Sequence, residues 1–193
     1  KQRLEQIPIV APGVDQVVRE QRLKPVAVLV THGHVDHMWC VAPVAGTYDA
    51  TAYVHPADRH LLSDPMAGMS RETAAMMLGG KFQFAEPDRV EELTDLQTVE
   101  LAGLSFTVDH APGHTPGSVV FRVAGNAFTG DTLFKGAIGR SDLLGGSGRQ
   151  LLTSIVTKLL VLDDDTVVLP GHGEKSTIGL ERRTNPFLEG LRL

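Results

Sequence analysis

The segment His32-Gly33-His34-Val35-Asp36-His37 constrains the fold and the chemistry of this chain more than any other. It follows Val26–Val30, an apolar, valine-rich run without charge, which is the pattern of a buried strand. The segment therefore lies in a loop at the end of a strand, where α/β proteins often place functional side chains. Imidazole and carboxylate groups are ligands that suit zinc, iron or manganese. The segment thus predicts a metal site at the end of a strand.

The spacing of these four side chains divides them into two pairs. Alternate residues of an extended chain face the same side, so His32 and His34 can bind one ion. Asp36 and His37 lie beyond them and can turn toward a second ion. The alternative, a group of solvated surface histidines, would repel itself when protonated and would gain nothing from burial. We therefore predict a site for two metal ions.

Strands and helices alternate along the 193 residues, which predicts a single α/β domain over 1–193. Helical spacing of apolar residues predicts helices over 14–23, 37–48, 57–62, 150–162 and 178–183, and a loop over 64–81 with one helix around 71–78. Strand patterns cover 26–31, 51–54, 90–93, 98–101, 104–109, 118–123, 127–129 and 166–169.

Three more ligand-type side chains stand in glycine- or proline-containing turns that follow predicted strands. They are His114 in Ala111–Gly117, Asp131 in Thr129–Thr132 and His172 in Pro170–Gly173. Each alone is an ordinary turn residue. Four strand ends that all deliver ligands are hard to explain by chance, so we predict that these side chains complete the metal site.

The segments that carry these residues resemble the five motifs of the metallo-β-lactamase superfamily. The resemblance is to its glyoxalase II-like (hydroxyacylglutathione hydrolase-like) members in their short bacterial form, and it runs from about Pro25 to the C-terminus. The matching segments are Thr31–His37, Pro112–Gly117, Thr129–Phe134, Gly139–Asp142, Leu169–Gly173, Thr177–Gly179 and Glu181–Leu188. The resemblance implies an αβ/βα four-layer sandwich with the site at one edge of two packed sheets. Family members begin with additional strands, so we expect that N-terminal strands are missing from this sequence.

The resemblance also implies a role for each ligand-type residue. It assigns His32, His34 and His114 to metal 1, and Asp36, His37 and His172 to metal 2, with Asp131 bridging the two ions. Asp131 and Asp36 are the expected catalytic carboxylates, and Arg140 is the expected substrate-binding residue, as an anchor for an anion. The expected cofactors are two divalent ions, zinc first, with iron or manganese as alternatives.

The function that follows is hydrolysis of a thioester, S-lactoylglutathione or a related S-acyl thiol, by a hydroxide that bridges the metals. A thiolate leaves without a general acid, which favours thioesters over lactams. The alternative is a mononuclear iron persulfide dioxygenase on the same fold. Those enzymes have Ala-His-Asp-Tyr at the last motif, whereas this chain has Pro170–Gly173, which favours the hydrolase.

This sequence differs from the glutathione-specific members of the family at two places. Ser141-Asp142 and Gly173-Glu174 stand where those members have tyrosines. The helical C-terminal domain that completes their glutathione pocket has no counterpart here, so no separate C-terminal glutathione-binding domain is expected. The identity of the thiol carrier is therefore open.

Charge and composition limit the partners. A formal net charge of -5 argues against nucleic acid. No apolar run approaches the ~20 residues of a membrane span, so no membrane partner is expected. The only cysteine is Cys40, which excludes an intramolecular disulfide and is compatible with the reducing cytoplasm, the expected location. The expected partner is a small-molecule thioester, and the sequence leaves the oligomeric state open.

Overall fold

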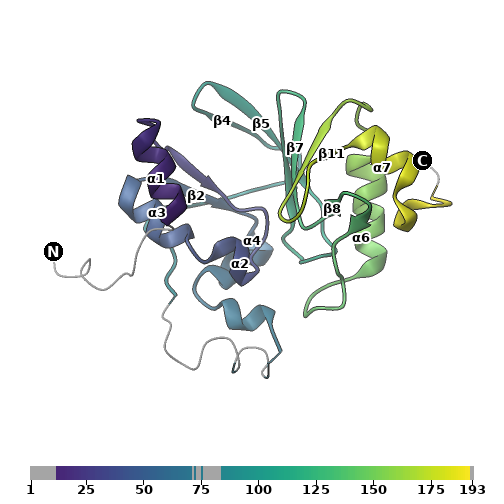
Figure 1. Ribbon diagram of the computed structural model, residues 1–193. Helices are drawn as coiled ribbons and strands as arrows, with labels where there is room; N and C mark the ends of the chain where they lie inside the picture. The colour runs from purple at the N-terminus through teal and green to yellow at the C-terminus, as the bar shows by residue number, and fades with distance from the viewer. Residues whose placement is uncertain (1–11, 71, 73–74, 76–83, 192–193) are drawn as a thin grey trace.

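Two β-sheets packed against each other form the centre of the molecule, and helices cover the outer face of each sheet (Figure 1). The computed structural model describes residues 12–70, 72, 75 and 84–191. The expected αβ/βα four-layer arrangement is confirmed. The expectation that N-terminal strands are missing is not tested, because the described residues begin at Pro12, and most of the helix predicted around 71–78 also lies outside the described residues. No helix in the described ranges is long and apolar enough to cross a membrane.

The first sheet holds three parallel strands, β1 (Ala27–Leu29), β2 (Thr51–Val54) and β3 (Val90–Glu92), in the order β1-β2-β3. Its connecting segments form α2 (Val35–Met38), α3 (Val41–Tyr48), α4 (Pro56–Arg59), η1 (His60–Leu62) and η2 (Pro65–Gly68), after α1 (Pro12–Glu20). β-branched and small apolar residues of these strands pack under the helices. This core is formed by Val30, Met38, Val41, Ala52, Val54 and Leu62.

The second sheet holds six strands in the order β11-β10-β7-β6-β5-β4, antiparallel except for the β10–β7 pair. Its strands are β4 (Thr98–Leu101), β5 (Leu104–His110), β6 (Val119–Val123), β7 (Asn126–Gly130), β10 (Val167–Pro170) and β11 (Ser176–Thr177). A small hairpin, β8 (Leu133–Phe134) and β9 (Ala137–Ile138), lies beside it. The helices on this side are α6 (Gly148–Ser154), the π-helical turn η3 (Ile155–Leu159), α7 (Ile178–Thr184) and η4 (Pro186–Leu188).

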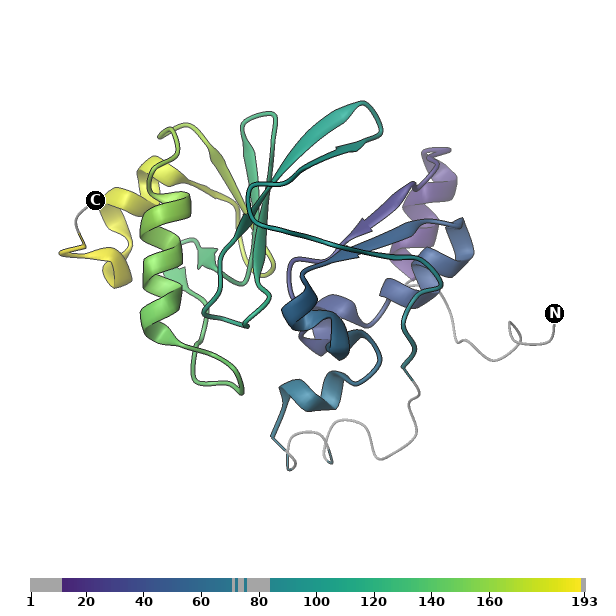
Figure 2. The same ribbon diagram turned by 180° about the vertical axis from the view of Figure 1, so that it is seen from behind.

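The inner faces of the two sheets share a core, and the view from behind shows the chain crossing from one sheet to the other (Figure 2). Leu29 and Tyr53 of the first sheet pack against Val108 and Phe121 of the second. The backbone N–H of Val119 donates to the carbonyl of Thr31 at 2.8 Å. The end of β1 is therefore fixed directly to the second sheet, immediately before His32.

The structure differs from the predicted elements in places where local geometry intervenes. The helix predicted over 37–48 is divided into α2 and α3. Pro43 has no N–H to donate within a continuous helix, whereas in α3 it falls in the first turn, where no donor is needed. The helix predicted over 150–162 ends in the π-helical turn η3. The strands predicted over 118–123 and 127–129 pair with each other as the antiparallel hairpin β6–β7.

Gly113 provides a test of how tightly the His114 turn is packed against α6. Its φ is +138°, and a Cβ there would lie 2.1 Å from the backbone nitrogen of Leu151. Gly113→Ala should therefore lower the free energy of unfolding by at least about 2 kcal/mol, from backbone strain and overpacking. Gly125→Ala is the matched control, because its φ is +76° but nothing lies within 4 Å. It should cost only about 1 kcal/mol. Equal losses in urea unfolding would contradict this packing argument.

Candidate metal centre

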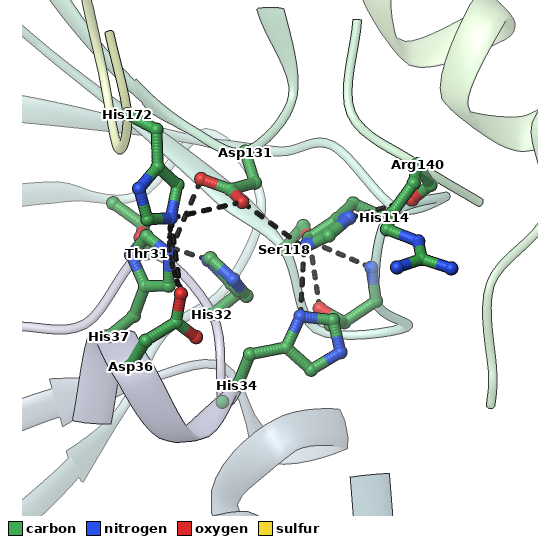
Figure 3. A network of polar contacts seen from close by, with 12 residues as sticks. Thr31, His32, His34, Asp36, His37, His114, Ser118, Asp131, Arg140 and His172 are labelled. Atoms are coloured by element: carbon green, nitrogen blue, oxygen red, sulfur yellow. Dashed lines mark hydrogen bonds and ion pairs between the residues drawn. The ribbon is translucent and has the colours of Figure 1, made fainter. Parts of the chain in front are cut away.

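Four strand ends bring the seven predicted ligands to one place. His32, His34, Asp36 and His37 follow β1, and the last two lie on α2. His114 follows β5, Asp131 follows β7 and His172 follows β10. Figure 3 shows all seven side chains pointing toward one another, with loops from both sheets contributing. The constellation predicted from the sequence is thus assembled in space.

Half-site 1, defined as His32, His34 and His114, is buried. Their exposed fractions are 1%, 8% and 2%, and one ring nitrogen of each lies within 4.8 Å of the others. Nδ1 of His34 and Nε2 of His114 are 2.8 Å apart. Nitrogen atoms at these separations can all reach one ion.

Half-site 2, defined as Asp36, His37 and His172, is open to solvent. The side chains of Asp36 and His172 are 55% and 57% exposed, while that of His37 is 13% exposed. Nε2 of His172 lies 3.0 Å from Nε2 of His37 and 3.1 Å from Oδ2 of Asp36. Three ligand atoms again converge, on the side of the site that faces water.

Asp131 lies between the two half-sites (Figure 3). One of its oxygens is 3.4 Å from Nε2 of His37, and the other is 3.7 Å from Nε2 of both His114 and His172. His32, His37 and Asp131 also form a ligand group of their own, which joins the half-sites. Close approach of the last strand end requires a glycine, because a Cβ at Gly171 would lie 2.3 Å from Oδ1 of Asp131. The two oxygens of Asp131 therefore face ligand-type nitrogens of both half-sites.

Hydrogen bonds on the far side of the rings orient the ligand nitrogens. Nδ1 of His114 lies 2.7 Å from the carbonyl oxygen of Arg140. A carbonyl only accepts, so Nδ1 carries the hydrogen and Nε2 keeps its lone pair for the site. Nδ1 of His32 lies 3.2 Å from Oγ1 of Thr31. Nε2 of His110 lies 2.9 Å from the carbonyl oxygen of Pro116, and His110 does not join the ligand groups found among the described residues.

The protonation of the two half-sites differs. Burial lowers the pKa of His32 well below its ordinary value, and neighbouring histidines lower it further. Burial, with the charge of His114, lowers the pKa of His34 to about 4. Burial also acts to lower the pKa of His37, but hydrogen bonding to Asp131 and the charges of Asp131 and Asp36 outweigh it and raise this pKa. Burial acts to raise the pKa of Asp131, but His37 reverses this and lowers it.

This chemistry fits a pair of cations. Nε2 of His32 is buried and has no hydrogen-bond partner among the described residues. A buried polar atom left without a partner costs about 1–3 kcal/mol, and a bound ion removes that cost. Neutral imidazoles with lone pairs facing inward, together with an ionised carboxylate between them, are the donor set that divalent zinc, iron or manganese accepts.

The centre opens into a cleft of about 990 Å³. Arg140 lies at its rim and makes two hydrogen bonds to Asp142, at 2.9 and 2.8 Å. The sequence predicted Arg140 as a binding residue but gave Asp142 no role, although both belong to the Gly139–Asp142 motif. Apolar residues form another part of the wall: Val35, Met69, Leu143 and Leu144. A second carboxylate that the sequence did not reveal, Asp58, is buried behind half-site 1.

Protons should displace the two ions at different pH values. A raised pKa means that His37 takes up a proton first as the pH falls, whereas His32 and His34, with lowered pKa values, stay neutral. In equilibrium dialysis at a fixed low zinc concentration, we expect the ion of half-site 2 to leave first as the pH falls. The other should leave at lower pH. Release of both at a single pH would contradict the asymmetry.

Comparison with known proteins agrees with this geometry. Residues 6–172 match the model of the family described as the metallo-beta-lactamase superfamily. An uncharacterized Mycobacterium tuberculosis protein is 55% identical over 197 residues, covering 95% of this chain and 87% of that one. "Probable metallo-hydrolase YqgX" of Bacillus subtilis is 36% identical over 182 residues, covering 93% and 83%. Hydroxyacylglutathione hydrolase GloC of Haemophilus influenzae is 34% identical over 187 residues, covering 93% and 86%.

Solved structures are also similar. The BLEG-1 B3 metallo-beta-lactamase has a TM-score of 0.82 at 38% identity, covering 92% of this chain and 84% of that one. A protein crystallised in a di-iron-bound form, TTHA1623, has a TM-score of 0.76 at 38% identity, covering 91% and 84%. ETHE1 from Myxococcus xanthus has a TM-score of 0.71 at 27% identity, covering 90% and 67%. With its fold, its gathered strand-end ligands and these matches, the chain belongs to the metallo-β-lactamase superfamily.

Proposed function

We propose that this protein is a metal-dependent hydrolase of thioesters, acting on S-lactoylglutathione or a related S-acyl thiol. The observation that carries the proposal is the joining of two ligand groups through Asp131 at the base of an open cleft. Two divalent ions, when bound there, acidify a water molecule and polarise a carbonyl group. We propose zinc as the metal, with iron or manganese as alternatives.

The residues around the centre support this chemistry. Asp131 is ionised, because its pKa is lowered, and its oxygens face both half-sites. It can accept a hydrogen bond from a water molecule and so orient the water for attack. Asp36, at the open side, is the second carboxylate that we propose for catalysis.

The leaving group separates thioesters from amides. A thiolate, with a conjugate pKa of ~8.5, departs without being protonated, whereas an amide nitrogen needs a proton. Apart from the ligands, the ionisable groups in the described wall of the cleft are Arg140 and Asp142. Arginine keeps its proton, and the hydrogen bonds from Arg140 lower the pKa of Asp142 to about 2. Neither can serve as a general acid at neutral pH.

The Arg140–Asp142 pair supports a proposal about the thiol carrier. Both side chains are more than half exposed at the rim of the cleft, where an arm extending from the acyl group would lie. Arg140 can bind a carboxylate of that arm through two parallel hydrogen bonds. To do so it must exchange Asp142 for the substrate, so the anchor is weaker than a free arginine would be.

The relatives provide further support. One curated relative is named as a hydroxyacylglutathione hydrolase and another as a metallo-hydrolase. The similar di-iron-bound structure supports occupancy by two ions. The B3 metallo-beta-lactamase similarity makes a lactam the necessary comparison substrate.

The decisive experiment combines metal analysis of the purified protein with three assays. Two ions per chain and turnover of S-lactoylglutathione or a simpler S-acyl thiol are expected, with little hydrolysis of a chromogenic cephalosporin. Oxygen consumption on a persulfide, with one iron per chain, would replace the proposal by the persulfide dioxygenase alternative. Efficient lactam hydrolysis without thioester turnover would also overturn it.

The substitution Asp131→Ala removes the carboxylate that faces both half-sites. We expect kcat to fall by at least about a hundred-fold, because charge at the reaction centre is lost, and metal content to fall below that of the parent protein. Metal content is read by atomic absorption after dialysis. Full activity in this variant would refute the bridging role.

Substitutions at the rim should change KM in opposite directions. Arg140→Ala should raise the KM for S-lactoylglutathione about ten-fold, since a charge-assisted hydrogen bond to the carrier is lost. Asp142→Asn should lower this KM, because Arg140 is released from its partner. A neutral S-acyl thiol of the same acyl group is the control and should keep its KM in both variants. Equal effects on the neutral and anionic substrates would exclude Arg140 as the anion anchor.

A further inference from the structure

Asp58 is a fully buried carboxylate outside the ligand set. It lies on α4, after β2 of the first sheet, and its exposed fraction is 0%. Its Oδ2 accepts hydrogen bonds from the backbone N–H of Gly33 at 2.8 Å and from Oγ1 of Thr115 at 2.6 Å. Its Oδ1 accepts one from the N–H of Gly117 at 2.7 Å. A charge taken out of water persists only with such compensation.

Two of the three groups that donate hydrogen bonds to Asp58 belong to residues next to predicted metal ligands. Gly33 stands between His32 and His34, and Thr115 directly follows His114. The first loop comes from the three-stranded sheet and the second from the six-stranded sheet. One carboxylate thus joins the two loops that supply all three ligands of half-site 1. None of its donors adjoins a ligand of half-site 2.

The charge of Asp58 matters as well as its hydrogen bonds. Half-site 1 consists of three imidazoles, and the carboxylate of Asp131 that faces it also faces the other half-site. The charge of Asp58 acts on His34 in the direction that favours a cation near that ring. Asp58 accepts its hydrogen bonds from Gly33, Thr115 and Gly117, so its charge acts on the ligand rings through space and favours a bound cation by Coulomb attraction.

We propose that Asp58 is a positioning residue that forms half-site 1 before the ion arrives. It holds the His32–His34 loop and the His114 loop at binding distance and places a negative charge behind them. This inference rests on the metal centre of the proposed function, but it is independent of the substrate.

Asp58→Asn is a sharp test because the amide cannot reproduce the pattern. If the amide oxygen occupies the Oδ2 position, its NH₂ group faces the N–H of Gly117. If the amide is reversed, the NH₂ group faces the N–H of Gly33. In either orientation two donors oppose each other, so one loop must shift.

The effect should be confined to half-site 1, so it is measured in two backgrounds with zinc and a competing fluorescent chelator. His172→Ala leaves half-site 1 intact, and His114→Ala leaves half-site 2 intact. Adding Asp58→Asn should weaken zinc binding about ten- to a hundred-fold in the His172→Ala background. In the His114→Ala background the affinity should change by no more than about two-fold.

Glu181→Gln is the matched control for loss of a buried carboxylate. Glu181 is also 0% exposed and accepts from the N–H of Gly136 and from Asn185, both at 2.8 Å, and from Oγ of Ser176. Its amide can keep the first two bonds and donate to the serine hydroxyl. Glu181→Gln should therefore leave the zinc affinity unchanged in the His172→Ala background. If Asp58→Asn does not fold, Thr115→Val replaces it and should weaken half-site 1 selectively, because it removes one hydrogen bond but keeps the charge.

Three outcomes would overturn the proposal. Equal weakening in both backgrounds would reduce Asp58 to a general structural role, and no weakening in either would remove the role altogether. A folded His172→Ala protein that binds no zinc would overturn half-site 1 itself, and the proposal with it. Because the readout is zinc affinity, failure of the thioester assay would leave this result unaffected.

Discussion

The constraint on which the structure depends is the close packing of hydrogen-bond acceptors at the metal centre. Five histidine rings and two carboxylates converge at one edge of the sandwich, with ring centroids 4.1 Å apart for His32 and His37 and 4.5 Å apart for His34 and His114. The acceptor atoms in such a cluster face few hydrogen-bond donors. The arrangement therefore costs free energy unless a cation is bound between them. The fold around it supplies the rigidity that keeps these groups from turning away.

That rigidity comes from strand ends and from hydrogen bonds behind the rings. β1, β5, β7 and β10 are fixed in sheets, and each ends just before a ligand. The carbonyl of Arg140 fixes the His114 ring, so the segment that carries the proposed substrate anchor also orients a metal ligand. In the proposed function, binding of the carrier and the geometry of the centre would thereby be connected through one stretch of backbone.

The gathering of the seven ligand-type side chains could be predicted from the sequence because the signal of each is local. A strand pattern followed by glycine or proline and then by His or Asp places each side chain at a sheet edge without knowledge of the topology. Asp58 could not be found in this way, because it stands in none of these motifs. Its hydrogen-bond partners, Gly33, Thr115 and Gly117, are 25, 57 and 59 residues away in the sequence. The pairing of Arg140 with Asp142 was missed because spacing does not show whether two neighbouring side chains turn toward each other. The division of the 37–48 helix depended on Pro43, whose effect on helix continuity is itself a sequence rule.

The origin of the ligands in two sheets has a mechanical consequence. His32 and His34 belong to the loop after β1, whereas His114 comes from the six-stranded sheet, and half-site 2 is divided between Asp36 and His37 on one side and His172 on the other. Any ion held by three ligands in either half-site is therefore a cross-link between the two layers of the sandwich. Its binding energy is also energy that holds the layers closed, as a disulfide would across a long loop. Loss of metal would then loosen this edge of the sandwich in addition to removing the catalytic centre.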